Sequence, residues 1–301
     1  MINYEKDLVS VIMPTYKRAD KLDRAIKSVL GQTYKKLELI LVNDNNPDDK
    51  YSRMLVQIVD KYKSDSRFRF ICQRKHINGA VARNLGIKNA NGEFIAFLDD
   101  DDWWKAEKIE RQICELKSRT DEWGGVSCRI QQYNNDKEIA KLPKYEDGYI
   151  YKDILMLKSD IATGTLLLRH SYLDDVGYFD EKLLRHQDLQ LLVNFTFKYK
   201  LYQLDEFLHC CDVSDTMNRP DGEKLIQFKS MFFQSVASVM NSLSDRERRC
   251  VYCINNFEIA YVFLKDRNYR KAIRYGVLIF RSPKAILLAI KKIFSKVKNK
   301  I

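Results

Sequence analysis

The sequence lacks any apolar run long enough to cross a membrane. Its 301 residues contain no stretch of about 18 uninterrupted apolar residues, which is close to the length that a transmembrane helix needs. Residues 1–7 also lack the apolar core of a signal peptide. We therefore expect a chain without a membrane-spanning segment that is made and kept in the cytoplasm.

A disulfide framework is missing as well. The seven cysteines are odd in number and have no paired spacing, which is typical of a reducing compartment. Cys250 and Cys253 form a lone CxxC, and a zinc site would need a second pair or a nearby histidine. We interpret all seven as ordinary thiols.

Acidic residues are absent from positions 267–301, which contain 11 Lys and Arg. The remaining 41 basic residues balance the 41 acidic ones in positions 1–266, so this tail carries the whole net charge of +11. An excess confined to one segment argues against a general nucleic-acid-binding surface and indicates a basic appendage. With 45% apolar residues, the rest of the chain can bury a sizeable core.

Apolar periodicity predicts alternating strands and helices in the first third of the chain. The expected strands are 9–14, 37–42, 68–72 and 93–98, and the expected helices are 19–32, 51–62 and 80–90. This order calls for a mostly parallel sheet covered by helices, with the carboxyl ends of its strands along one crevice. Further along, the expected helices are 105–118, 171–176, 186–199, 228–243, 245–264 and 270–297, and the expected strands are 126–133 and 163–169.

Four consecutive carboxylates, Asp99 to Asp102, follow the apolar strand at 93–98. Adjacent ionised carboxylates raise one another's pKa unless a cation such as Mg²⁺ or Mn²⁺ supplies the opposite charge. A metal held by one or two carboxylates keeps positions open for phosphate oxygens, which indicates a nucleotide-bearing substrate. The alternative is a solvated loop or a helix N-terminus, but the buried strand before the cluster favours a site.

Five segments, matching in order and spacing over roughly residues 7–215, resemble the family 2 glycosyltransferases. They are 9–18, 28–34 with 38–44, 82–87, 92–104, and 176–181 ahead of Asp188. Members of this family are inverting enzymes with the GT-A fold that use nucleotide-sugar donors. The resemblance implies an α/β, Rossmann-like, mostly parallel sheet flanked by helices as a catalytic domain at 1–220, followed by a helical C-terminal extension at 221–301.

The resemblance also implies a donor site. Asp99, Asp100 and Asp101 look like the DxD motif, in which Asp101, together with Asp99, would ligate Mn²⁺ or Mg²⁺ at the diphosphate, and Asp99 and Asp100 would contact ribose, donor sugar or metal-bound water. Asp102 has a competing role as the cap of the following helix.

Other strand ends would complete this pocket. Pro14, Thr15 and Tyr16 would line it, with Tyr16 stacking on the base, and Asp44 would accept a hydrogen bond from the base. Arg83 would offer a planar cation to the diphosphate. The alternatives are an Asx turn at Asp44 and a structural ion pair between Arg83 and Asp99.

Asp188 is the catalytic base that the resemblance implies, although its neighbours differ from the usual Glu-Asp pattern; the alternative is an acid that complements a helix dipole. Thr163, Gly164 and Thr165 resemble the segment that lines the acceptor site, where small residues leave room for a sugar ring. His186 and His209 could contact a metal or phosphate, and we assign neither.

The basic tail interleaves apolar residues with Arg and Lys, and Pro283 divides its helix. Such a helix can lie on an anionic membrane surface or pack on its own catalytic domain. We expect peripheral attachment to the inner face of the cell membrane, where lipid-linked saccharide acceptors reside.

Together these features predict an inverting, metal-dependent hexosyltransferase. It would move a hexose or hexosamine from a UDP-sugar to a saccharide acceptor, lipid-linked, in bacterial surface polysaccharide synthesis such as that of O-antigen or capsule. A processive synthase is disfavoured because the Gln-x-x-Arg-Trp motif is missing. A nucleotidyltransferase, which would ordinarily show a Gly-rich phosphate loop, and a non-catalytic membrane-associated scaffold are the alternatives.

Overall fold

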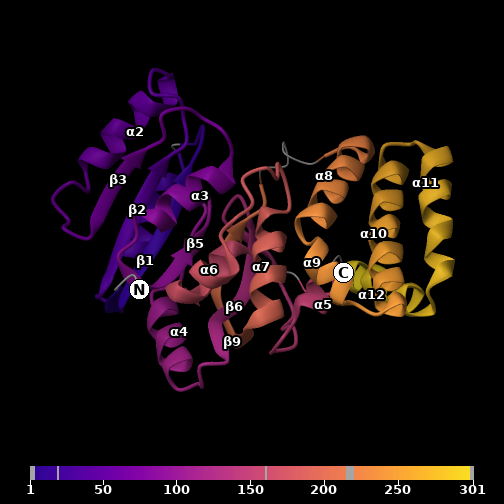
Figure 1. Ribbon diagram of the computed structural model, residues 1–301. Helices are drawn as coiled ribbons and strands as arrows, with labels where there is room; N and C mark the ends of the chain where they lie inside the picture. Colours follow the sequence, from indigo (N-terminus) through magenta and orange to yellow (C-terminus); the bar gives the residue numbers. More distant parts are fainter. Residues whose placement is uncertain (1–3, 19, 160, 215–219, 299–301) are drawn as a thin grey trace.

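The computed structural model describes residues 4–18, 20–159, 161–214 and 220–298, with side chains up to residue 291. Within these residues it contains one nine-stranded sheet in the order β3-β2-β1-β4-β8-β6-β9-β5, with β7 beside β6. The strands are β1 (Glu5–Thr15), β2 (Leu37–Asn43), β3 (Phe68–Cys72), β4 (Gly92–Phe97), β5 (Trp103–Trp104), β6 (Trp123–Asn134), β7 (Lys137–Lys141), β8 (Leu167–Arg169) and β9 (Lys200–Asp212). Helices flank this sheet, and a helical region follows it (Figure 1), so the predicted α/β fold is confirmed.

The first four long strands form the parallel part of the sheet. β1 pairs in parallel with β2 and β4, and β2 with β3. The connecting helices are α1 (Leu22–Leu30), α2 (Lys50–Asp60) and α3 (Gly79–Lys88). Every residue of β2 is buried, as expected for a parallel strand covered on both faces. The carboxyl ends of β1, β2 and β4 therefore meet at one edge.

The second part of the sheet is mixed. β8 runs antiparallel to both β4 and β6, whereas β9 runs parallel to β6 and antiparallel to β5. The sequence does not predict β9, because its register against β6 shifts between Cys128 and Arg129, whose partners are Leu204 and Phe207. Such an irregularity breaks the alternation by which a strand is recognised.

Helices cover both faces of the sheet. Val9, Val11 and Met13 of β1 pack toward α1 and α4 (Lys108–Lys117), whereas Ile12 packs on the other face toward α3. A Cβ on Gly86 would lie 2.3 Å from Ile12 Cγ2, so glycine is what allows α3 to lie this close to β1.

The shorter elements of the middle region are α5 (Tyr151–Leu155), η1 (Thr163–Thr165), α6 (His170–Val176) and α7 (Gln187–Lys198). The C-terminal helices are α8 (Gly222–Ser235), α9 (Ala237–Ser242), α10 (Asp245–Lys265), α11 (Tyr269–Gly276), η2 (Val277–Arg281) and α12 (Pro283–Lys298). Pro283 is the first residue of α12, a position where its missing N–H costs little, and the predicted break in the tail is confirmed.

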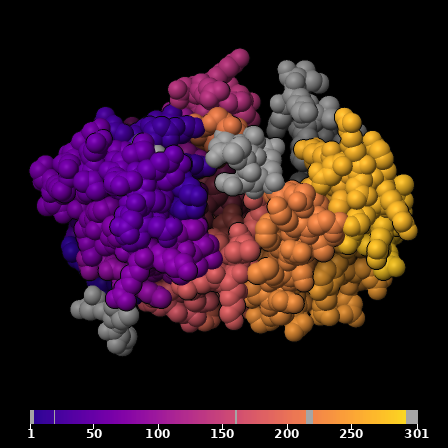
Figure 2. Space-filling view, turned by 90° about the horizontal axis from the view of Figure 1, so that it is seen from above, coloured from indigo at the N-terminus to yellow at the C-terminus, as the bar shows by residue number. Residues whose placement is uncertain are grey.

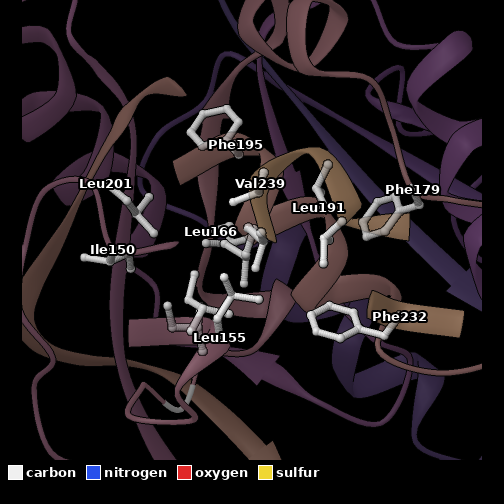
Figure 3. Close-up of a cluster of buried hydrophobic side chains, with 14 of the residues drawn as sticks. Ile150, Leu155, Leu166, Phe179, Leu191, Phe195, Leu201, Phe232 and Val239 are labelled. Atoms are coloured by element: carbon white, nitrogen blue, oxygen red, sulfur yellow. The ribbon is translucent and has the colours of Figure 1, made fainter. Parts of the chain in front are cut away.

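The C-terminal helices share a core with the sheet region. Phe232 and Val239 pack in the same cluster as Leu155, Leu191 and Phe195 (Figure 3). In the tail, Ile279, Ala285 and Ala289 are buried in this cluster too. One face of the tail therefore packs on its own chain, mainly against α10 of the extension rather than against the catalytic domain that the alternative interpretation named. The boundary at residue 220 stays a prediction. None of the described helices combines the length and apolar character that crossing a bilayer requires.

Candidate active site

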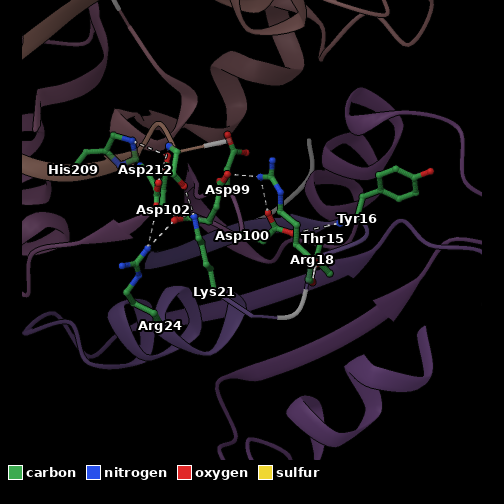
Figure 4. Close-up of polar contacts among 12 residues, drawn as sticks. Thr15, Tyr16, Arg18, Lys21, Arg24, Asp99, Asp100, Asp102, His209 and Asp212 are labelled. Atoms are coloured by element: carbon green, nitrogen blue, oxygen red, sulfur yellow. Dashed lines mark hydrogen bonds and ion pairs between the residues drawn. The ribbon is translucent and has the colours of Figure 1, made fainter. Parts of the chain in front are cut away.

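The ends of β1 and β4 bring Thr15, Tyr16, Asp99 and Asp100 together (Figure 4), and the end of β2 adds Asp44. Asp44 N donates to the carbonyl of Thr15 over 2.9 Å, and Tyr16 N donates to Asp100 Oδ2 over 3.4 Å. Pro14 and Thr15 are the last two residues of β1. On the face that carries these strand ends, the molecular surface is hollowed between the N-terminal part and the C-terminal helices (Figure 2).

Asp44 and Tyr16 form one wall with two residues that the sequence does not single out. The Tyr16 ring stacks on His76 with centroids 3.8 Å apart and planes at 9°. The carboxylate of Asp44 accepts a hydrogen bond from Gln73 Nε2 over 2.6 Å, and its Oδ1 lies 3.1 Å from His76 Nδ1. Burial raises the pKa of Asp44, and His76 opposes this rise.

The Asx-type turn at this point is made by the preceding residue. Asn43 Oδ1 accepts from the backbone N–H of Asn45 over 2.9 Å. The carboxylate of Asp44 instead contacts Gln73 and His76, and it is buried at the edge of the sheet.

Two arginines contact the first three acids of the cluster. Arg83 Nη2 lies 2.5 Å from Asp99 Oδ1, so the structural ion pair considered for these residues exists. Arg18 Nη1 lies 3.5 Å from Asp100 Oδ1 and pairs with Asp101 Oδ2. Arg18 belongs to the first matching segment, but the sequence gives it no role.

These cations do not neutralise the cluster. Burial and the nearby Asp102 and Asp99 raise the pKa of Asp101 to about 8. Burial also raises the pKa of Asp100 to about 6. Burial would raise the pKa of Asp99 too, but the Arg83 guanidinium holds it below its usual value. The cluster can therefore be fully ionised near neutral pH only if more positive charge is added.

The last acid of the cluster, Asp102, does not cap the following helix, so that prediction is wrong: α4 begins after Glu107. Asp102 Oδ1 accepts from the backbone N–H of Asp212 over 2.8 Å. Asp102, His209 and Cys211 each offer a ligand atom within 4.8 Å of the others.

His209 is fully buried, and neither of its ring nitrogens has hydrogen-bond geometry to a described atom, although Nε2 lies 3.2 Å from Asp102 Oδ2. Carboxylates with raised pKa values beside a buried, unsatisfied imidazole form a donor set that suits a divalent cation. The ligand atoms that lie together are those of Asp102, His209 and Cys211 rather than those of the predicted Asp101 and Asp99, whose roles as metal ligands stay a prediction.

The carboxylate of Asp212, at the end of β9, lies beside the cluster of four acids. Asp212 Oδ2 is 2.8 Å from Lys21 Nζ and 3.3 Å from Arg24 Nη2. Burial works against ionisation of Asp212, but hydrogen bonds from Lys21 and Ser214 hold its pKa below the usual range. None of these residues was predicted, since β9 itself was not.

Asp188 is the second residue of α7. Burial raises the pKa of its carboxyl, while the charge of Arg83 opposes the rise and that of Asp99 supports it. Asp188 lines a cavity of about 330 Å³ together with Arg185, His186 and Glu258. Because Glu258 belongs to α10, the C-terminal extension supplies part of this cavity's wall.

The predicted acceptor residues Thr163, Gly164 and Thr165 form η1 and are buried. The carbonyl of Gly164 accepts from Trp104 Nε1 over 2.8 Å. A Cβ on Gly164 would lie 2.4 Å from His209 Cε1, so this segment lies directly behind that histidine. Their role at an acceptor site stays a prediction.

Known proteins similar to this chain were found at three levels. A family model described as Glycosyl transferase family 2 matches residues 10–177. An uncharacterized glycosyltransferase of Rickettsia typhi is 32% identical over 200 residues, covering 64% of this chain and 60% of the relative. The Escherichia coli UDP-Glc:alpha-D-GlcNAc-diphosphoundecaprenol beta-1,3-glucosyltransferase WfgD is 42% identical over 106 residues, covering 35% of this chain and 40% of WfgD.

Solved structures share the fold. TarS 1-349 of S. aureus in complex with UDP-GlcNAc has a TM-score of 0.61 at 15% identity, covering 90% of each chain. The Pyrobaculum calidifontis mannosyltransferase PcManGT in complex with GDP-Man and Mn²⁺ has a TM-score of 0.59 at 17% identity, covering 95% of this chain and 80% of that one.

The family model covers more than half of the chain. The chain itself spans less than two thirds of the length of these curated relatives. It spans only 16% of a Rickettsia felis glycosyltransferase, with 44% identity over 105 residues. The matched residues include the acid cluster, Arg83 and Tyr16, whose roles in a donor site stay predictions. The chain belongs to glycosyl transferase family 2.

Proposed function

We propose that this chain transfers a hexose or hexosamine from a UDP-sugar, with inversion, to a lipid-linked saccharide acceptor in bacterial surface polysaccharide synthesis. The observation that carries the proposal is a partly buried acid cluster at the strand ends, with the stacked rings of Tyr16 and His76 on one side and Asp188 near the same acids. Two relatives support the donor class: WfgD is named for UDP-Glc, and the TarS structure contains UDP-GlcNAc.

The nucleotide would bind at the Tyr16 wall. The Tyr16 ring, already stacked on His76, presents an aromatic surface to a base, and Asp44 accepts an N–H of uracil. Pro14 and Thr15 line the same end of β1, and Asp100, held near Tyr16 N, contacts the ribose or donor sugar. Arg83 keeps Asp99 ionised and offers a cation to the diphosphate.

Asp101 and Asp99 would hold Mn²⁺ or Mg²⁺, and the nearby Asp102 and His209 enlarge the donor set. A bound divalent cation would supply Lewis-acid neutralisation of the departing diphosphate. Asp100 and Asp102 are buried, which strengthens the charge interactions of these two carboxylates with their neighbours.

Asp188 would act as the base. Its raised pKa brings it closer to the pH at which a carboxylate removes a proton effectively. As the acceptor hydroxyl oxygen bonds to the anomeric carbon, its proton passes to Asp188, and the bond from that carbon to the diphosphate oxygen breaks with its electron pair on the diphosphate. A single displacement of this kind inverts the anomeric carbon. The cavity beside Asp188 is our candidate for the acceptor side, to which we also assign Thr163, Gly164 and Thr165, since this segment begins two residues after Ile161 of the cavity lining.

A membrane surface would supply the acceptor. WfgD is named for a diphosphoundecaprenol-linked acceptor, and the basic segment 267–301 can meet anionic lipid by charge. We place the chain peripherally on the inner face of the cell membrane, with no nucleic acid partner.

Transfer assays with single donors test this function. We would incubate the chain with UDP-Glc, UDP-GlcNAc, UDP-Gal or GDP-Man, with and without Mn²⁺, and a lipid-linked GlcNAc acceptor. We expect transfer from one UDP-sugar, a product of inverted anomeric configuration by NMR, and loss of activity on removal of Mn²⁺ or in Asp188→Asn.

Asp175→Asn is the matched control, since Asp175 forms an exposed pair with Lys198. If no nucleotide raises the melting temperature and no donor is consumed, the scaffold alternative stands. Release of pyrophosphate from UTP and a sugar 1-phosphate would instead establish a nucleotidyltransferase.

A further inference from the structure

The C-terminal helices contain a second concave region, remote in sequence from the donor site. Two cavities of about 580 and 670 Å³ lie between the first half of α10 and the junction of η2 with α12, and Arg249 and Arg281 line both. Both volumes are within the range of small-molecule sites. Arg246 and Lys284 line the larger cavity. We call this region, defined by those four residues, the basic groove.

The four cations of the basic groove have no ion pair among the described residues. Two acids line the same cavities, and both pair with other residues: Asp245 lies 3.8 Å from Arg248, and Glu247 pairs with Lys152 over 2.7 Å. Arg248 donates to the carbonyls of Met240, Asn241 and Leu243. Glu247 also caps α10. The groove therefore holds an excess of positive charge in a concave surface, which is what an anionic ligand requires.

The arginines of the groove indicate its ligand more specifically than the lysine does. A guanidinium presents its N–H groups in a fixed planar fork that matches two oxygens of a phosphate. Arg249 and Arg281 come from different elements, α10 and η2, and meet at the boundary of both cavities. A phosphate group placed between them would be contacted from two sides.

Exposed apolar side chains adjoin the residues of the groove in the sequence. Val277, Phe280 and Leu287 are 51%, 74% and 61% exposed. Val277 and Phe280 are three residues apart in a 3-10 helix and so lie one above the other. Phe280 adjoins Arg281, and Leu287 lies about one turn after Lys284 in α12. Cations beside exposed aliphatic and aromatic side chains are typical of surfaces that meet the headgroup and acyl region of a lipid together.

We propose that the basic groove binds the phosphate of an anionic phospholipid headgroup while Phe280 and its apolar neighbours enter the acyl region. The inference deepens the membrane part of the proposed function by naming the ligand chemistry and the residues. It extends beyond the basic tail, because Arg246 and Arg249 lie in α10. The experiment measures lipid binding alone. Sugar transfer can therefore fail while lipid binding at the groove is confirmed, and lipid binding can fail while sugar transfer is confirmed.

Co-sedimentation of the full chain with vesicles tests the site. One vesicle is phosphatidylcholine alone, and the other contains phosphatidylcholine and phosphatidylglycerol in equal amounts. We expect wild type to bind only the second. Arg249→Glu with Arg281→Glu should bind about thirty-fold more weakly, equivalent to about 2 kcal/mol, since each basic residue near the surface contributes about 1 kcal/mol.

The matched control is Lys6→Glu with Lys88→Glu, which changes net charge equally at two exposed lysines outside the groove that have no ion pair among the described residues. It should retain binding. Phe280→Ser changes no charge and should weaken binding at least about tenfold. All variants alter exposed side chains, and unchanged melting temperatures would confirm that they fold.

Three results would overturn the proposal. Equal losses in the groove and control variants would mean a diffuse charge effect. Unchanged binding in Arg249→Glu with Arg281→Glu would remove the groove from the interaction. Binding of glycerol 3-phosphate in solution as tightly as of vesicles, unaffected by Phe280→Ser, would show a site for a soluble phosphate instead.

Discussion

Replacing Asp101 by Asn measures how strongly the acid cluster depends on an added cation. Asp101 is 14% exposed and pairs with Arg18, yet burial and its acidic neighbours raise its pKa to about 8. In the unfolded chain an aspartate titrates near 3.9. Between these values the folded state keeps a proton that the unfolded state has released, so the free energy of unfolding must fall as the pH rises through this window.

The size of the effect follows from the linkage relation. Each pH unit within the window lowers the free energy of unfolding by about 1.4 kcal/mol, so going from about pH 5.5 to about pH 7.5 costs about 2–3 kcal/mol. Asparagine keeps the shape and cannot ionise, so the variant escapes this loss. For a chain of 301 residues the difference corresponds to roughly 3–5 °C in melting temperature, since the unfolding entropy is about 2.1 cal/mol/K per residue.

Thermal unfolding of EDTA-treated protein at the two pH values provides the assay. We expect Asp101→Asn to melt close to wild type at the lower pH and above it at the higher pH, where Mn²⁺ should raise wild type alone. Asp205→Asn is the control, because Asp205 also pairs with an arginine, Arg129, but is 67% exposed. Parallel melting curves for wild type and Asp101→Asn, or a more stable wild type near pH 7.5, would refute the reasoning.

Three further predictions concern the nucleotide-binding role of Tyr16, the catalytic role of Asp188 and the packing of α3. Tyr16→Ala should raise the Kd for UDP about ten- to hundredfold in calorimetry, because stacking on a base contributes about 1–3 kcal/mol; an unchanged Kd would place the base elsewhere. Asp188→Asn should lower kcat by about 10²–10⁴ with the Kd for UDP unchanged, and equal losses in both would argue against a base. Gly86→Ala should destabilise by about 1–3 kcal/mol in urea, because its Cβ would lie 2.3 Å from Ile12; Gly276→Ala, with 3.7 Å to the nearest atom, should not.

The first half of the fold could be predicted because each element follows one period. β3 lies at the predicted residues 68–72, and β2 differs by a single residue at its end. The second half could not be predicted as well, since its pairing is non-local: β9 pairs with β6 through an irregular register, and two-residue β5 is a strand only by pairing with β9. Short or bulged strands carry little periodic signal.

The same difference separates the site residues that were predicted from those that were missed. Asp44 and Asp99 to Asp101 directly follow regular strands, so the sequence alone brings them to one edge. His76 and Gln73 lie after β3 and reach Asp44 only through the pairing of β2 with β3. Asp212 required β9, and the role of Arg18 depends on a side-chain direction that no periodicity contains.

The C-terminal helices supply part of the wall of the cavity beside Asp188. Lys229 of α8 is buried, pairs with Glu258 of α10 and donates to Asn255 Oδ1 over 2.6 Å; Asn255 Nδ2 in turn donates to the carbonyl of Leu155 in α5 over 2.9 Å. A buried ammonium is stable only when its partners stay in place. This network therefore favours one orientation of the extension relative to the sheet region. Glu258 also lines the cavity beside Asp188. A chain cut after residue 220 would therefore expose part of the shared core and lose one wall of that cavity, even though every residue of the acid cluster would remain.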